Sequence, residues 1–233
     1  MDVCERLHRA QQAAADGQHD EALREYIWFH EHALDFEPSL YGVRLSFAMG
    51  YWLDLAKVYP EALRALKDIR DQKTQRLLAG DGNRELFHDV ESINEHLKDE
   101  RATYEMFLKL NAANPSLARS CVSLAMPAIV KSGDCHLARR FIADPFEKIQ
   151  RWSTTLNEDI ANLANEPSRE TPVQDTYVHI YVERINLLLS VLNGTGEYEN
   201  AERLRASALE SIESPLVREA VRVALESSSE TEA

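Results

Sequence analysis

The amino-acid sequence predicts an all-α protein of about twelve helices that pack as antiparallel pairs. Leu and Ala supply 55 of the 233 residues, whereas Val and Ile supply 23, and this balance favours helices over strands. Gly and Pro together supply only 16 residues, too few for the many turns of a β-sandwich or barrel. Apolar residues recur at i, i+3, i+4 and i+7 from Leu7 to Leu225, as they do along amphipathic helices.

Short breaks that contain Gly or Pro separate the predicted helices. Gly ends a helix in the left-handed conformation, and Pro is favoured in the first turn of the next helix. These breaks lie at 16–17, 37–38, 80–83, 114–115, 132–134, 144–145, 193–196 and 214–215. The polar stretch 165–172 predicts a loop, and the polar tail 226–233 predicts disorder because it has no large apolar side chain to bury.

One form of turn occurs three times, with a Gly followed five residues later by an Ala. The pairs are Gly17 with Ala22, Gly133 with Ala138, and Gly196 with Ala201. The Gly permits the left-handed residue that ends the first helix. The small Ala allows the second helix to approach its neighbour closely, so we expect all three alanines to be buried.

The third turn, Gly196-Glu-Tyr-Glu-Asn-Ala201, resembles the inter-helix turn of the tetratricopeptide repeat (TPR) family. The resemblance extends through 84–118, where Lys98 replaces the turn Gly and Leu110 replaces a smaller residue. A second such unit follows 35 residues on, close to the TPR period. The matching positions are Phe87, Val90, Thr103, Phe107, Pro115, Val122, Ala125, Gly133 and Ala138.

The resemblance implies a right-handed solenoid of helix pairs. It places TPR-like units near 3–36, 84–118, 119–152 and 182–215. An atypical pair occupies 39–80, where Trp52, Leu55, Ala56 and Tyr59 match a first-helix signature before Pro60 interrupts it, and an extra helix occupies 146–164. We therefore expect one helical array over 1–164, the loop 165–172, and C-terminal helices over 173–225 packed on the same array.

The charge balance and the cysteines narrow the class of protein. A net charge of −13 opposes binding to nucleic-acid phosphates. The most apolar predicted helix, near 40–59, carries charged residues, so we expect no membrane span. Because the three cysteines are far apart and form no metal or redox motif, we expect reduced thiols and a cytoplasmic protein. They are Cys4, Cys121 and Cys135.

Catalytic and metal-binding motifs are largely missing from the sequence. There is no phosphate-binding loop and no nucleophile elbow, and His30-Glu31 does not continue into a zinc motif because Leu34 follows. We therefore expect no cofactor, no metal and no catalytic residue. His88, Glu91 and Glu95 share one predicted helix face, which suits either a metal or acid–base site or a solvated surface.

Arg44 lies in the segment Tyr41–Leu55, which is apolar almost all round. A buried guanidinium must be paired or must reach water. Two interpretations follow: a structural ion pair to a neighbouring helix, or a group that binds an anion such as a carboxylate of a partner.

The resemblance also implies a function, because TPR-like proteins commonly bind peptides or helices on their concave face. We therefore expect a protein-binding module or adaptor with a partner that is basic. The polar positions that the TPR register places in the groove are Glu85, His88, Ser92, Glu95, Ser120, Ser123, Glu183, Asn186 and Ser190. The second candidate surface surrounds Tyr41, Arg44 and Tyr51. The alternatives are a self-associating protein that dimerises through 39–80, and an enzyme with its site in the groove.

Overall fold

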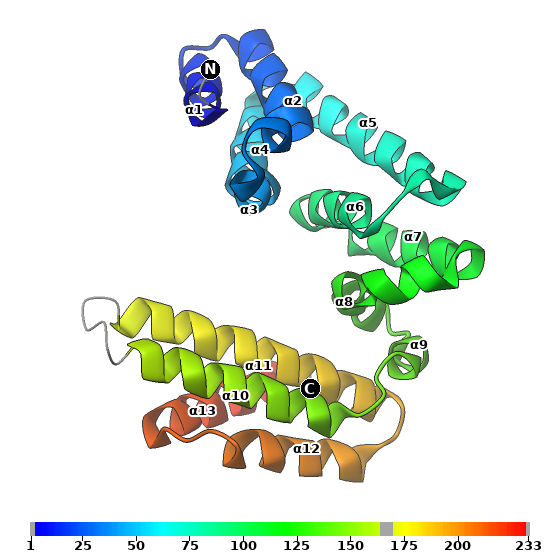
Figure 1. Ribbon diagram of the computed structural model, residues 1–233, viewed down its shortest axis with the longest axis vertical. Helices are drawn as coiled ribbons and strands as arrows, with labels where there is room; N and C mark the ends of the chain where they lie inside the picture. The colour runs from blue at the N-terminus through cyan, green and yellow to red at the C-terminus, as the bar shows by residue number, and fades with distance from the viewer. Residues whose placement is uncertain (1–2, 164–169, 232–233) are drawn as a thin grey trace. The chain divides into compact units, whose positions relative to one another are not determined.

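The computed structural model describes residues 3–163 and 170–231, and 88% of it is helical. No strand occurs in these ranges, so the predicted all-α class is confirmed (Figure 1). The chain forms two compact units, residues 1–128 and residues 129–233, called the first and second unit below. The solenoid arrangement, its handedness and the TPR resemblance stay predictions.

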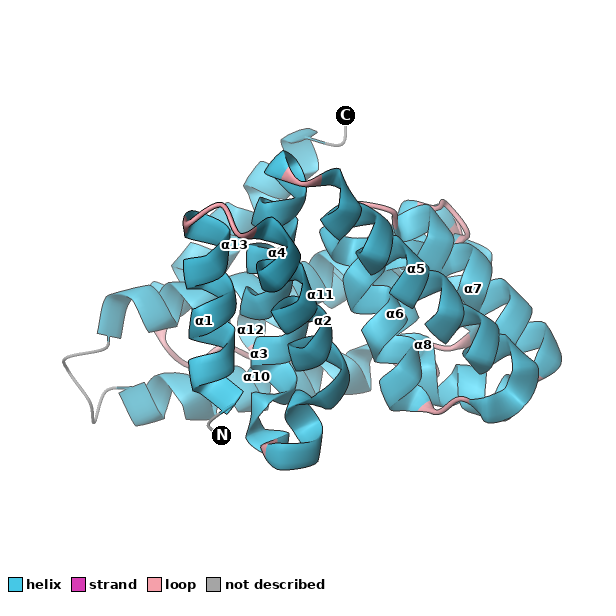
Figure 2. Ribbon diagram, turned by 90° about the horizontal axis from the view of Figure 1, so that it is seen from above, coloured by secondary structure: helices cyan, strands magenta, loops and turns pink. Residues whose placement is uncertain are grey.

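The first unit is built from helices that follow one another through short turns (Figure 2). Its α-helices are α1 (Val3–Ala15), α2 (His19–Phe36), α3 (Tyr41–Leu45), α4 (Phe47–Val58), α5 (Pro60–Arg76), α6 (Arg84–His96), α7 (Glu100–Ala113) and α8 (Pro115–Lys131), which ends just beyond it. Two short helical segments, η1 (Pro38–Leu40) and η2 (Leu77–Asp81), join α2 to α3 and follow α5.

The segment 41–55 is not the single helix that its apolar pattern predicts. Ser46 has φ −123° and ψ −89°, and it separates α3 from α4. The hydroxyl of Ser46 donates to the carbonyl of Gly42 at 2.8 Å, a local bond that competes with the regular helix. Trp52, which carries the expected first-helix signature, is buried and donates from Nε1 to the carbonyl of Ala62 at 2.9 Å.

The second unit is organised around the longest helix of the described chain. Its helices are α9 (Cys135–Arg140), α10 (Pro145–Leu163), α11 (Glu170–Gly194), α12 (Tyr198–Glu210) and α13 (Pro215–Thr231). Helix α11 packs against each of the other four. The hydroxyl of the buried Tyr181 donates to the carbonyl of Ala208 at 2.9 Å and so joins α11 to α12.

Two expectations about the polar segments change. Within the predicted loop 165–172, residues 170–172 belong to α11, whereas 165–169 lie outside the described residues. The predicted disordered tail was wrong for 226–231, because α13 continues to Thr231. Arg222 explains the start of this extension, since its Nη1 donates to Oε1 of Glu226 at 2.6 Å, one turn later. Residues 232–233 lie outside the described residues.

The repeated turn is present at all three predicted positions. Gly17, Gly133 and Gly196 have φ of 75°, 79° and 79°. In each turn the amide that follows the Gly donates to the carbonyl five residues earlier, as from Gln18 to Ala13. Ala22, Ala138 and Ala201 are 0%, 0% and 3% exposed, so their predicted burial is confirmed.

A fourth copy of this turn lies at Lys98, where the sequence lacks a Gly. Lys98 has φ 56°, and the amide of Asp99 donates to the carbonyl of Asn94 at 2.8 Å. Thr103, five residues after Lys98, is buried at the position of the alanines. The turn therefore forms between α6 and α7 without the residue that favours it.

Candidate functional site

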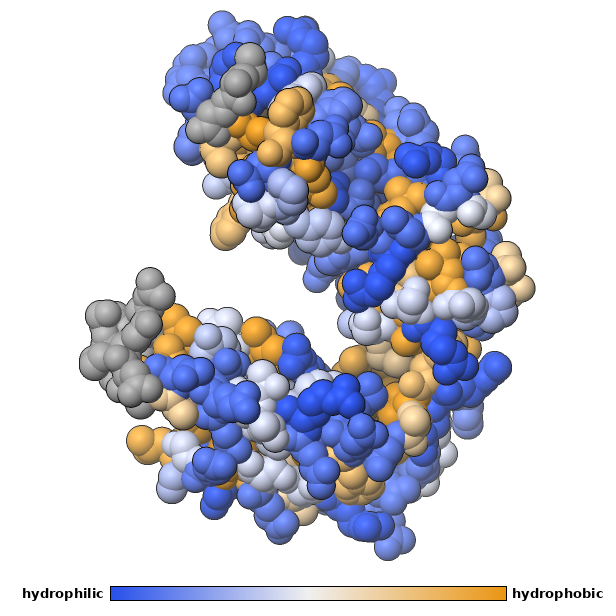
Figure 3. Space-filling model, viewed as in Figure 1, coloured by the Kyte–Doolittle hydropathy of each residue, from blue (hydrophilic) through white to orange (hydrophobic). Residues whose placement is uncertain are grey.

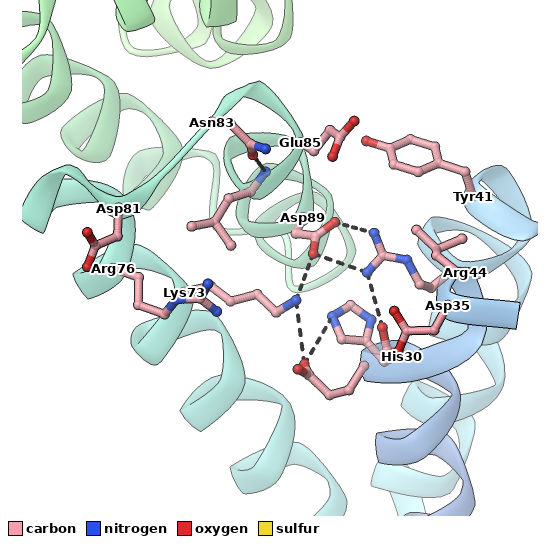
Figure 4. Close-up of a pocket in the computed structure, with 13 residues that line it drawn as sticks. His30, Asp35, Tyr41, Arg44, Lys73, Arg76, Asp81, Asn83, Glu85 and Asp89 are labelled. Atoms are coloured by element: carbon pink, nitrogen blue, oxygen red, sulfur yellow. Dashed lines mark hydrogen bonds and ion pairs between the residues drawn. The ribbon is translucent and has the colours of Figure 1, made fainter. Parts of the chain in front are cut away.

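A buried ion cluster joins three helical elements of the first unit (Figure 4). Arg44 of α3 binds Asp89 of α6 through two nitrogens, with Nη1 3.1 Å from Oδ2. Lys73 of α5 donates to the same Oδ2 at 2.7 Å. All three side chains are buried. Burial alone would raise the pKa of Asp89, but the two cations outweigh it and hold this pKa below its ordinary value.

The structural ion pair is therefore the interpretation of Arg44 that the geometry supports. Arg44 also donates from Nη1 to the carbonyl of His30 at 3.3 Å, which anchors α3 on α2. Its Nε is buried and has no hydrogen-bond partner among the described residues. One donor of this guanidinium is therefore not used by the ion pair.

His30 lies beside this cluster and is 4% exposed. Its ring meets that of Trp52 edge-on, with 6.2 Å between the ring centres. Neither ring nitrogen has a hydrogen-bond partner in the part of the chain that the structure describes. Burial and the charges of Lys73 and Arg44 lower the pKa of His30 to about 3, so the imidazole is neutral at pH 7.

These four side chains line a cavity of about 320 Å³. His30, Arg44, Lys73 and Asp89 form its buried floor. Its mouth carries exposed charged side chains, the carboxylates Glu31, Asp35, Asp81 and Glu85 and the guanidinium Arg76. The mouth is thus acidic, whereas two cations share the buried carboxylate of the floor.

The face of the first unit that Figure 3 shows is mainly polar. In the space-filling view, hydrophobic residues of the first unit form small patches between hydrophilic ones (Figure 3). Large apolar side chains that are exposed include Phe36, Phe47 and Val58, and none of them lines the cavity. Charge, rather than apolar area, therefore distinguishes this site.

Helix α6 brings some of the predicted groove residues to the cavity but not others. Glu85 is at the mouth, and Tyr41 lines the cavity with its hydroxyl 2.8 Å from Nδ1 of His88. Glu95 is exposed but does not line the cavity. Ser92 was wrongly expected on a solvated wall: it is buried and donates to the carbonyl of Leu45 at 2.8 Å, because α3 covers this face of α6.

The predicted residues of α8 lie near the start of α6. Ser120 and Ser123 are exposed. Arg84 donates from Nε to the carbonyl of Ser120 at 3.0 Å and from Nη2 to Oγ of Ser123 at 3.3 Å. These serines therefore bind a side chain of their own chain, and neither lines the cavity.

The remaining groove residues belong to α11 of the second unit. Glu183 is exposed and lies 3.3 Å from Nε2 of His179. Asn186 and Ser190 are half-buried, and the carbonyl of Ser190 accepts the thiol of Cys135 at 3.6 Å, so α9 lies against this part of α11. These three residues belong to the second unit, and the cavity described above belongs to the first.

Tyr51 does not line the cavity that Tyr41 and Arg44 line. It lines a different cavity of about 260 Å³ together with Tyr26 and Asp54. The physical reason is the break at Ser46, which separates the helix of Tyr51 from that of Tyr41 and Arg44.

The face of His88, Glu91 and Glu95 has the shared orientation that the sequence predicts. Nε2 of His88 lies 4.0 Å from Oε2 of Glu91. No group of three or more metal-binding side chains is close enough to hold an ion among the residues described. Burial and the charge of Glu95 raise the pKa of Glu91 to about 7, so this carboxyl is partly protonated near neutral pH.

Sequence reasoning did not identify His30, Lys73 and Asp89 as site residues. Asp89 offers the best signal, because it stands between the apolar Phe87 and Val90 on a helix with a buried face. An acid in such a place is a candidate partner for a buried Arg44. No comparable pattern distinguishes Lys73 within the highly charged α5.

No protein-family model, curated protein or solved structure matches this chain. No helix among the described residues is long and apolar enough to cross a membrane.

Proposed function

We propose that the protein is a non-catalytic interaction module that binds a basic segment of a partner protein at the cavity of the first unit. The observation that carries this proposal is the acidic mouth. Asp35, Asp81 and Glu85 are exposed there with Glu31, and Arg76 is the exposed cation among the cavity-lining residues. Lys or Arg side chains of a partner complement such a surface.

The arrangement of the floor favours binding over catalysis. Arg44 and Lys73 are held on Asp89, so their charges already serve to join α3, α5 and α6. The residues that line the cavity include no Ser, Thr or Cys that could act as a nucleophile. The ring of Tyr41 also lines the cavity, where the guanidinium of Arg44 lies 5.6 Å from its centre.

The proposal is tested by reversing the charge of the mouth. The triple variant Asp35→Lys, Asp81→Lys and Glu85→Lys should weaken binding of a partner captured from the native cells at least tenfold. Affinity is measured by calorimetry, and circular dichroism checks that helicity is unchanged. Glu31 is left intact because it lies 3.5 Å from Lys73, where a new cation would disturb the ion cluster.

A matched control distinguishes the effect of charge at the mouth of the cavity from the effect of the protein's net charge on binding. Asp68, Glu202 and Glu210 are exposed carboxylates outside the cavity, and their reversal to Lys changes the net charge by the same amount. This control should retain the affinity. If the mouth variant binds the captured partner as tightly as the wild-type protein, the cavity is not the binding site.

A further inference from the structure

We infer that the cavity accepts a zwitterionic group, with a carboxylate at the buried floor and a cation at the mouth. A free lysine or arginine presents this chemistry, and so does a partner chain that ends in such a residue. The inference rests on the proposed function, because it names the group that the same cavity admits.

The floor offers hydrogen-bond donors that the protein does not use. Nε of Arg44 and both ring nitrogens of His30 are buried without a hydrogen-bond partner among the described residues, and Nε2 of His30 lies 4.0 Å from Oε1 of Glu31. A neutral imidazole donates from one of its nitrogens. Leaving such buried groups without a hydrogen bond destabilises the folded protein. Carboxylate oxygens accept hydrogen bonds only, so they match these donors.

The charged groups of the floor are already paired with one another. Arg44 and Lys73 share the carboxylate of Asp89, and His30 is neutral. The nearest additional carboxylate is that of Glu31, 3.5 Å from Nζ of Lys73 and itself partly exposed. Two cations therefore face two carboxylates, so the unused donors of Arg44 and His30, and not an excess of positive charge, would hold the carboxylate of a ligand.

The mouth excludes a simple anion. An inorganic phosphate or a plain carboxylate would have to pass Asp35, Asp81 and Glu85, which are all exposed at the entrance. A ligand whose carboxylate is joined to a cation compensates these charges while its anionic end reaches the floor. The volume of 320 Å³ is near the lower limit for small-molecule sites, which suits a single amino-acid residue.

The inference is tested with four small probes and the unmodified protein, by calorimetry. Nα-acetyl-lysine carries both the carboxylate and the cation. Nα-acetyl-lysine amide lacks the carboxylate, Nα-acetyl-norleucine lacks the cation, and inorganic phosphate carries only negative charge. We expect Nα-acetyl-lysine to bind at least tenfold more tightly than each of the other three.

Two peptides distinguish the possible sources of the ligand. Both end in Lys, one as the free acid and the other as the amide. Tighter binding of the free-acid peptide than of free lysine identifies the end of a partner chain, whereas tighter binding of free lysine, whose α-amine is not acylated, identifies the free amino acid. If acid and amide bind equally in both the probe and the peptide pairs, the inference is overturned, while the proposed function stands because basic peptides still bind.

Variants assign the two ends of the ligand. His30→Phe keeps an aromatic ring but removes both nitrogens, and it should abolish the preference for the acid over the amide. Glu85→Gln should reduce the preference for Nα-acetyl-lysine over Nα-acetyl-norleucine, whereas Glu95→Gln, on the same helix but outside the cavity, should not. Unchanged preferences in both His30→Phe and Glu85→Gln would place the ligand elsewhere. Loss of all binding to basic peptides by the wild-type protein would instead contradict the proposed function.

Discussion

His30 and Glu91 make the stability of the first unit depend on pH in opposite directions. Folding lowers the pKa of His30 from 6.5 to about 3. Between these two pH values the imidazole is protonated in the unfolded chain but neutral in the folded chain. Folding raises the pKa of Glu91 from 4.5 to about 7. Between these two pH values the carboxyl group is protonated in the folded chain but ionised in the unfolded chain. Each effect changes the unfolding free energy by about 1.4 kcal/mol per pH unit.

We therefore predict that the two effects oppose each other between pH 5 and pH 6.5, a window that lies inside both shifted ranges. His30→Phe should leave the effect of Glu91, so that stability falls as the pH rises through the window. Glu91→Gln should leave the effect of His30, so that stability falls as the pH is lowered. Urea denaturation at several pH values measures both slopes, and slopes of the same sign in the two variants would contradict the prediction.

Asp89 should be the most costly single side chain of the ion cluster to remove. Asp89→Ala leaves Arg44 and Lys73 buried without their shared carboxylate. Losing one partner of a buried ion pair typically costs about 3–5 kcal/mol. The control Asp81→Ala removes an exposed carboxylate of the same cavity and should cost less than about 0.5 kcal/mol. Equal losses in urea denaturation would show that the cluster does not stabilise the fold.

For single residues, the sequence shows that a buried charge must be compensated, but it does not show which residue compensates it. An arginine in an apolar segment requires compensation, and this much follows from Arg44 alone. Asp89 lies 45 residues away along the chain, so the partner depends on how α3 crosses α6. His30 gives still less signal, because a histidine on an apolar helix is compatible with many surroundings.

Among the turns between helices, the turn at Lys98 is the one where a single substitution should stabilise the protein most clearly. A non-glycine residue in the left-handed region costs about 1–2 kcal/mol, and Lys98 has φ 56°. Lys98→Gly should therefore raise the unfolding free energy by about 0.5–1 kcal/mol, after the entropy that glycine adds to the unfolded chain. Thermal denaturation measures the change. Lys67→Gly, in the exposed interior of α5, should instead lose about 1 kcal/mol.

Replacing the buried alanines that follow the turns with a larger residue should destabilise the protein. Ala22, Ala138 and Ala201 are buried in equivalent positions. Their replacement with Leu should cost about 1–3 kcal/mol each by overpacking, as measured by urea denaturation. Ala206→Leu, at an exposed position of α12, is the control and should be nearly neutral. Neutral effects at all three buried positions would show that the helices can separate to accept the larger side chain.

The elements that the sequence predicts correctly are those with local causes. Gly17, Gly133 and Gly196 end their helices because of their own conformational freedom. The break at Ser46 and the continuation of α13 past Glu226 were not predicted. They depend on bonds between side chains and backbone or between side chains one turn apart, which composition and apolar spacing do not reveal.

For the whole molecule, the charge of −13 should act on the rate of association. A long-range negative field accelerates the approach of a basic ligand, and salt screens it over about 8–10 Å. We predict that the association rate of a basic peptide falls at least tenfold between 20 and 500 mM NaCl, while dissociation changes less. Stopped-flow fluorescence measures both rates. A rate constant that does not depend on salt would exclude electrostatic steering.

The bonds that join α3 to α6 also bear on the order of assembly during folding. Tyr41 with His88, Arg44 with Asp89, and Ser92 with Leu45 connect residues 47, 45 and 47 positions apart, whereas the paired helices meet across turns of a few residues. Closing long loops costs more chain entropy, and distant contacts form more slowly than local ones. We therefore expect the helical pairs to form before the cavity does, so that the proposed binding site is completed late in folding and lost early in unfolding.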